Sequence, residues 1–172
     1  MKRYRKSISR PGFILFLLAV SMYLLPAGVA AGGYDEALQG VKGVKAVFDV
    51  SHGSPGSVNG IFLVVKNVYE EETVRSLPEK PQVVVVFRGP AVKLLSTDRS
   101  GFKKAEYAEL DKFHEMIRQM KKDGVTFEVC LYAAQALGVN PETILPEIDR
   151  EDNGFISVIG YQAQGYGVVA IP

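Results

Sequence analysis

The chain contains very little cysteine, histidine and tryptophan, and each shortage excludes a class of protein. Its 172 residues include one cysteine, two histidines and no tryptophan. A single cysteine cannot form a disulfide within the chain, so the fold is not a disulfide-stabilised scaffold. His52, His114 and Cys130 are widely separated and lack zinc-ligand spacing, so we predict no metal site. The glycine-rich motifs that hold nucleotide phosphates are also missing, and we predict no cofactor.

Residues 1–31 have the composition of a secretory signal peptide. Five basic residues within Lys2–Arg10 precede an almost uninterrupted apolar run at Gly12–Leu25, and small residues follow as far as Ala31. The segment has no adjacent arginine pair, which favours the general secretory route over the twin-arginine route. We therefore predict a periplasmic protein with one domain at residues 32–172. The apolar run is shorter than the roughly 20 residues of a spanning helix. We expect membrane contact only if the segment is retained uncleaved.

The part of the chain after this segment is mildly acidic. Without the five basic residues of the segment, 15 of the 20 lysines and arginines remain against 19 acidic residues, a net charge of −4. An acidic domain with no basic cluster is a poor ligand for nucleic acid, and we predict no such partner.

Strand and helix patterns alternate along the domain and predict an α/β fold. Val83–Val86 is a run of four valines, which is typical of a strand buried on both faces of a parallel sheet. The predicted strands are 45–50, 82–87, 126–130 and 166–171, and the main predicted helices are about 54–75, 105–122, 131–137 and 155–164. This order predicts a three-layer sandwich with a mainly parallel sheet and helices on both faces. The acidic run at 149–152 is interpreted as a solvated loop.

Chemically reactive or polar residues lie at the carboxyl ends of the first three predicted strands. They are Ser51–Gly53, Arg88–Pro90 and Cys130. Ligands of open parallel sheets bind outside the carboxyl ends of the strands, so these segments predict one site. A helix that begins after Cys130 would favour the thiolate, and Arg88 or His52 could stabilise that anion. Simpler interpretations stay open, since His52 could be a solvated loop residue and Arg88 could pair with a neighbouring acid.

Four segments of the domain resemble one known family. FEVCLYAAQALGV, VFDVSHGSP, VVVVFRGPAVKLL and IGYQAQGYGVVAIP are similar in order and spacing to segments of the exported branch of the DsrE-like (DsrE/DsrF/TusD-type) sulfur-relay proteins. The resemblance implies the three-layer α/β fold and a homo- or hetero-oligomer, commonly a trimer or a hexamer. It also implies that the matching cysteine carries a persulfide and passes its outer sulfur to a partner. That role falls on Cys130 alone.

The leading hypothesis is a periplasmic sulfur carrier or sulfurtransferase component that uses Cys130 and exchanges sulfur with a protein donor or acceptor. A second hypothesis is an oligomeric binding or scaffolding module whose cysteine is buried and inert. A third is a redox-sensing thiol that forms a disulfide between chains. A Cys–His hydrolase using His52 has neither a visible third member nor an oxyanion hole in the sequence.

Overall fold

A computed structural model of the protein describes residues 33–172, and the predicted signal segment lies outside them. Every helix and strand of the described residues falls within the compact unit Leu38–Pro172. None of the helices in this described part is long and apolar enough to cross a membrane.

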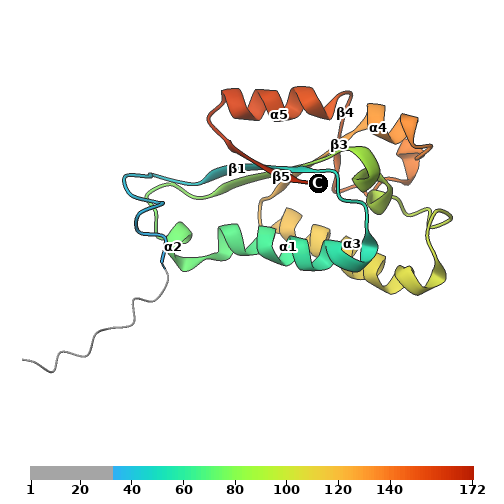
Figure 1. Ribbon diagram of the computed structural model, residues 1–172, viewed down its shortest axis with the longest axis horizontal. Helices are drawn as coiled ribbons and strands as arrows, with labels where there is room; N and C mark the ends of the chain where they lie inside the picture. Colours follow the sequence, from blue (N-terminus) through green and yellow to red (C-terminus); the bar gives the residue numbers. More distant parts are fainter. Residues whose placement is uncertain (1–32) are drawn as a thin grey trace, which may run out of the picture. The chain divides into compact units, whose positions relative to one another are not determined.

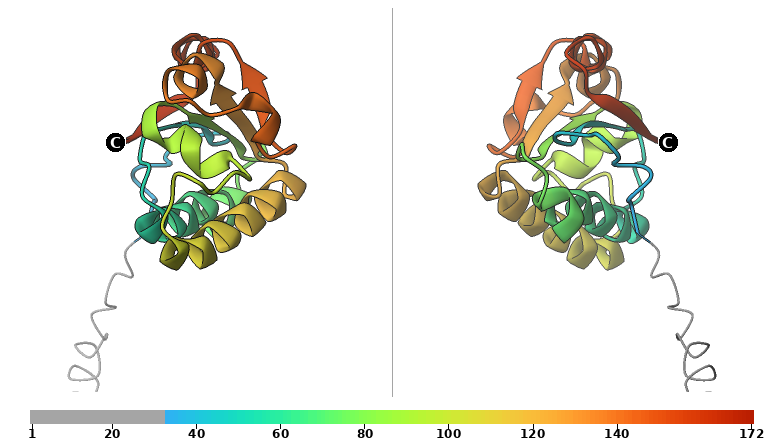
Figure 2. Two further views of the ribbon diagram at one scale, coloured as in Figure 1. Left: turned by 90° about the vertical axis from the view of Figure 1, so that its right-hand side faces the viewer. Right: turned by 90° about the vertical axis from the view of Figure 1, so that its left-hand side faces the viewer.

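Five strands form one sheet in the order β4-β3-β2-β1-β5, and every neighbouring pair is parallel. The strands are β1 (Lys45–Val50), β2 (Gln82–Phe87), β3 (Thr126–Cys130), β4 (Asp149–Glu151) and β5 (Gly167–Ile171). Because all five run in one direction, their carboxyl ends meet at one edge of the sheet. Figure 1 shows helices on both sides of the sheet, and the two views of Figure 2 show the same three layers. The predicted fold class is confirmed.

Two long helices and one shorter one cover the sheet. The helices are α1 (Pro55–Glu70), α2 (Glu72–Arg75), α3 (Tyr107–Lys122), α4 (Leu131–Ala136) and α5 (Gly154–Ala163), and the 3-10 segments are η1 (Gly89–Leu95), η2 (Lys104–Glu106) and η3 (Pro141–Thr143). α1 and α3 lie together on one face, whereas α5 lies on the other (Figure 1).

The face toward α1 and α3 holds the main core. Four fully buried phenylalanines contact one another across it, from α1 (Phe62), β2 (Phe87), α3 (Phe113) and β3 (Phe127). The rings of Phe62 and Phe113 meet edge to face with centroids 4.8 Å apart. Full burial of one such side chain contributes about 1.5–3 kcal/mol. This cluster therefore fixes α1 and α3 against the sheet.

The face toward α5 holds a smaller apolar cluster. Val47, Val84 and Val86 pack there against partly buried Val158, Tyr161 and Tyr166. Side chains alternate between the two faces of a strand, so alternate residues of the valine run serve the two cores. The same alternation directs Asp49, Arg88, Glu128 and Cys130 toward the α5 face. These four side chains therefore lie on one face of the sheet, in the half toward its carboxyl edge.

The predicted element boundaries agree closely with the structure, with one error. Residues 149–152 were predicted as a loop, but Asp149–Glu151 forms β4 at the edge of the sheet and pairs with β3. All three residues of β4 are exposed, so they have no apolar alternation to mark a strand. Backbone pairing alone defines this strand, and the pairing has a consequence for the site.

Candidate functional site

Three side chains form a row at the carboxyl edge of the sheet, on the face toward α5. Cys130 is paired in register with Glu151 of β4. On the β2 side of Cys130, the last residue pair is Phe87–Val129, so Arg88 and Cys130 are the next residues of the two chains. Residues paired in register point to the same face of a sheet. Cys130 therefore stands between an arginine and a glutamate.

Cys130 ends β3 and is also the N-cap of α4. Its backbone is extended, and its Sγ accepts a hydrogen bond from the backbone N–H of Ala133 at 3.4 Å. This is the bond that a serine or aspartate makes at the same helix position. The residue is only 4% exposed. The sulfur therefore accepts a hydrogen bond that would stabilise a thiolate, and it lies beneath the surface.

Gly154, the first residue of α5, brings Cys130 and Arg88 together. A Cβ atom at Gly154 would lie 3.0 Å from both Cys130 Cβ and Arg88 Cγ, so these two carbons are no more than about 6 Å apart. Contacts this short are tighter than almost all real Cβ contacts, so a residue without a side chain suits the close start of α5 beside the end of β3. The fold thus places the side chains of Arg88 and Cys130 near each other, while a role of Arg88 toward the thiol stays a prediction.

Arg88 is held in place by two neighbours. Its Nε donates to Asp49 Oδ1 at 2.5 Å and its Nη2 donates to Asp49 Oδ2, which gives a two-point ion pair. Its guanidinium carbon also lies 4.0 Å from the centre of the Phe155 ring. The side chains of Arg88 and Asp49 are 18% and 15% exposed. Asp49 therefore neutralises most of the charge that Arg88 presents, while Nη1 takes no part in this ion pair.

His52 lies after β1 and bonds to groups other than Cys130. Its Nδ1 is 3.2 Å from the carbonyl oxygen of Pro172, and its Nε2 is 2.6 Å from Ser57 Oγ. The Pro172 oxygen can only accept, so Nδ1 donates to it, and in the neutral ring Nε2 accepts from the Ser57 hydroxyl. The histidine joins the start of α1 to the chain after β5. Its ring is oriented by these two bonds and not by the thiol.

A group of carboxylates lies on the other side of Cys130. Glu128, two residues earlier on β3, accepts a hydrogen bond from the Tyr161 hydroxyl through Oε1 at 2.5 Å. Burial, followed by this bond, raises the pKa of Tyr161, which keeps the hydroxyl a donor. Burial, followed by the charges of Glu128, Asp149 and Asp152, raises the pKa of Glu151.

Glu128, Glu151 and Asp152 line a surface depression of about 410 Å³ between β3, β4 and α5, which we call the acidic hollow. Its lining residues are Glu128, Glu151, Asp152, Asn153, Ile156, Ser157, Gly160, Tyr161 and Gln164. Within residues 33–172, no three His, Cys, Asp or Glu side chains are arranged to hold a metal ion.

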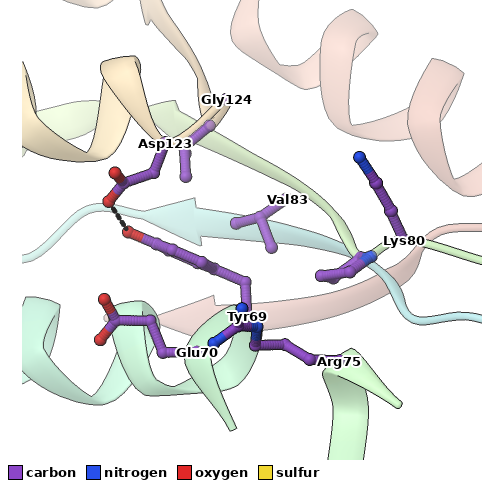
Figure 3. Close-up of a pocket in the computed structure, with 9 residues that line it drawn as sticks. Tyr69, Glu70, Arg75, Lys80, Val83, Asp123 and Gly124 are labelled. Atoms are coloured by element: carbon purple, nitrogen blue, oxygen red, sulfur yellow. Dashed lines mark hydrogen bonds between the residues drawn. The ribbon is translucent and has the colours of Figure 1, made fainter. Parts of the chain in front are cut away.

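Another pocket lies at the opposite, amino-terminal end of the strands. It is lined by residues before β2 and β3 and by the end of α1, and Tyr69 donates there to Asp123 at 2.9 Å (Figure 3). Burial, followed by this bond, raises the pKa of Tyr69. Parallel α/β sheets bind ligands at the other end, so this pocket is the weaker candidate.

The sequence prediction missed four residues of this site: Asp49, Glu128, Glu151 and Gly154. Glu128 could have been found, because it is two residues before Cys130 and a strand repeats every two residues. Gly154 and Glu151 carry no such signal. Their positions depend on the pairing of β4 and on the approach of α5, which are tertiary features.

The fold and the edge site define a class: a parallel α/β domain that places a single thiol at the strand-to-helix junction of a central strand. The chain belongs to the DsrE/DsrF-like family, whose model matches residues 45–171. This finding confirms the resemblance seen in the sequence. No curated protein matches the chain by sequence.

Solved structures share the fold at low sequence identity. A protein of unknown function from Methanobacterium thermoautotrophicum, MTH1491, is 17% identical with a TM-score of 0.58, and the match covers 74% of this chain and 98% of that one. A conserved protein of unknown function from Bacteroides thetaiotaomicron, BT1422, is 17% identical with a TM-score of 0.54 and coverages of 74% and 94%. At this identity the similarity establishes the fold alone.

We predict that Gly154→Ala destabilises the domain by about 1–3 kcal/mol, because the added methyl would overlap Cys130 and Arg88. Gly160→Ala on the same helix is the matched control, since a Cβ there meets no atom within 4 Å. It should be neutral or stabilising by up to about 1 kcal/mol. Urea unfolding measures both variants. Equal stability of the two variants would contradict the close approach of α5 to β3.

Proposed function

We propose that this protein is a sulfur carrier, or a component of a sulfurtransferase system, that holds sulfur as a persulfide on Cys130. The observation that carries the proposal is the position of Cys130, the chain's single thiol, at the carboxyl edge of the sheet in a DsrE/DsrF-like domain. We further propose that it acts in the periplasm after export by the general secretory route. That part of the proposal rests on the composition of residues 1–31.

The proposed step is transfer of a sulfane sulfur. The Cys130 thiolate attacks the outer sulfur of a donor persulfide, R–S–SH. A bond forms between Cys130 Sγ and that sulfur, the donor S–S bond breaks, and its electron pair leaves with R–S⁻. The product is Cys130–S–SH, and the reverse step on an acceptor thiol delivers the sulfur. No external oxidant or reductant enters this exchange.

Two donors near Cys130 suit an anionic sulfur. The Ala133 N–H already points to Sγ at 3.4 Å. Arg88 lies beside the residue and retains Nη1 outside its pair with Asp49. Hydrogen bonds and a nearby cation both stabilise a thiolate, and they would stabilise a persulfide anion in the same way. His52 is bound elsewhere, and we assign it no part in the transfer.

A second candidate function follows from the burial of Cys130. At 4% exposure the residue also fits an inert N-cap in a binding or scaffolding module. In that case the acidic hollow and the exposed surface of α5 would bind partners without sulfur chemistry. A third candidate, a disulfide between chains, requires Sγ to reach a partner thiol. The three candidates differ in what Cys130 does in the native protein.

We also propose that the protein self-associates through the surface formed by α5 and β5. β5 is an edge strand, and Val168 and Val169 are 40% and 44% exposed although they point to opposite faces. Ile159 of α5 is 65% exposed. An apolar edge strand is a template for pairing, and a second copy of the chain would cover it.

The sulfur-carrier proposal predicts that incubation with a low-molecular-weight persulfide adds one sulfur atom to the protein. Intact-mass spectrometry measures the addition, and a reductant should remove it. Cys130→Ser is the control and should show no addition. An unmodified wild type would contradict the proposal, as would an identical addition to the serine variant.

The self-association proposal predicts that Ile159→Lys lowers the mass measured by light scattering toward that of one chain. A buried lysine at an apolar contact is costly, whereas an exposed one is tolerated. Val64→Lys on α1 tests the opposite face, where Val64 is 69% exposed, and should leave the mass unchanged. A wild type that is monomeric at every concentration would refute the proposal.

A further inference from the structure

The acidic hollow lies beside Cys130 and contains no positive charge. Three carboxylates line it, from β3 (Glu128), β4 (Glu151) and the next residue (Asp152), and none of its lining residues is a lysine or an arginine. The remaining lining residues are uncharged. A depression with this lining attracts cations and repels anions.

One oxygen of Glu128 in the hollow is left without a hydrogen-bond donor. This side chain is buried, with the residue 7% exposed, and Tyr161 satisfies only its Oε1 atom. Its Oε2 atom is buried and has no hydrogen-bond partner among residues 33–172. Buried carboxylate oxygens are normally paired, because an unpaired one loses its hydration without compensation. A hydrogen-bond donor of a bound molecule would satisfy this oxygen.

Glu151 is a second carboxylate that a cation would stabilise. The raised pKa of its side chain reflects burial and the negative charges of Glu128, Asp149 and Asp152. Asp149 has a partner of its own, since its Oδ2 accepts from Lys121 Nζ at 3.1 Å. The repulsion that remains is therefore concentrated at the mouth of the hollow, around Glu151.

The register of the sheet links this hollow to the thiol. Glu151 is the direct partner of Cys130 across β3 and β4, and Glu128 points to the same face two residues earlier. Arg88, the cation on the other side of Cys130, is paired with Asp49. A molecule that reacts at Cys130 thus has the carboxylates of Glu128 and Glu151 on one side. On the other side it has the Arg88–Asp49 ion pair, whose charges largely cancel.

We propose that the acidic hollow binds a lysine or arginine side chain of the protein that exchanges sulfur with Cys130. A primary ammonium or a guanidinium would donate to Glu128 and Glu151 and supply the missing charge. Two exposed apolar side chains at the start of α5 fit a protein surface: Ile156, which lines the hollow and is 68% exposed, and its neighbour Phe155, which is 59% exposed. This inference rests on the proposed function, and it adds that the partner's reacting sulfur is flanked by basic residues.

The test uses the full-length protein and three peptides, Ac-Ala-Xaa-Cys-Xaa-Ala-amide, in which Xaa is Lys, Gln or Glu. Each peptide is a mixed disulfide with 5-thio-2-nitrobenzoate. Attack by the Cys130 thiolate on the peptide sulfur forms a protein–peptide disulfide and releases the coloured thiolate. Dividing each rate by that of the same peptide with 2-mercaptoethanol removes differences in intrinsic reactivity.

We expect the Lys peptide to react at least about fivefold faster than the Glu peptide, with the Gln peptide between them. Added salt should reduce the ratio, since it screens charges near the surface. Glu151→Gln should lower the ratio by about half or more. Glu72→Gln, on α2 on the other face of the sheet, removes the same charge and should leave the ratio unchanged.

Three results would overturn the inference. Equal normalised rates for the three peptides would remove the charge preference while leaving the persulfide proposal intact, because the mass measurement with a low-molecular-weight persulfide is separate. If Glu151→Gln and Glu72→Gln reduce the preference equally, the preference comes from the net charge of the protein and not from the hollow. Failure of every peptide to react would overturn the inference together with the proposed function.

Discussion

The parallel pairing of β3 with β2 on one side and β4 on the other is the constraint on which the site depends. It places Arg88, Cys130 and Glu151 in one row across three strands, on one face and at one edge. In an antiparallel arrangement the carboxyl ends of neighbouring strands would lie at opposite edges of the sheet, and no such row could form. The main core of four phenylalanines on the opposite face holds the sheet in this register.

The two faces of the sheet are used differently, and the difference explains where the polar residues lie. The face covered by α1 and α3 is wholly apolar in its centre, whereas the face covered by α5 includes Asp49 and Glu128. Each of these acids is provided with a partner, Arg88 for Asp49 and the Tyr161 hydroxyl for Glu128. Polar groups are costly to bury unpaired, and Glu128 Oε2 on this face is a buried carboxylate oxygen without a partner among the described residues, which is why we place the proposed ligand there.

The fold could be predicted from the sequence because its signals are local. The valine run, the apolar spacing of α3 and the alternation of strands with helices specify a three-layer parallel sheet. The placement of Cys130 and Arg88 at one edge could also be predicted, because Cys130 ends β3 and Arg88 directly follows β2. β4 was missed because its three residues are all exposed, so neither hydrophobic period nor propensity marks it. Glu151 and Gly154 were missed with it, since only tertiary pairing brings them to the thiol. His52 lies at the predicted edge, yet Ser57 and Pro172 bind its ring, which no spacing rule indicates.

The central claim is that Cys130 reacts in the folded protein although it is 4% exposed. The most direct test is the rate at which iodoacetamide alkylates the native chain, compared with the rate in a denaturing concentration of urea. A carrier that exchanges sulfur must open this residue to reagents, so the account predicts that the native protein is alkylated fully and at a rate within about tenfold of the unfolded chain. Alkylation that occurs only after unfolding would contradict this claim and would show that Cys130 has a structural role alone.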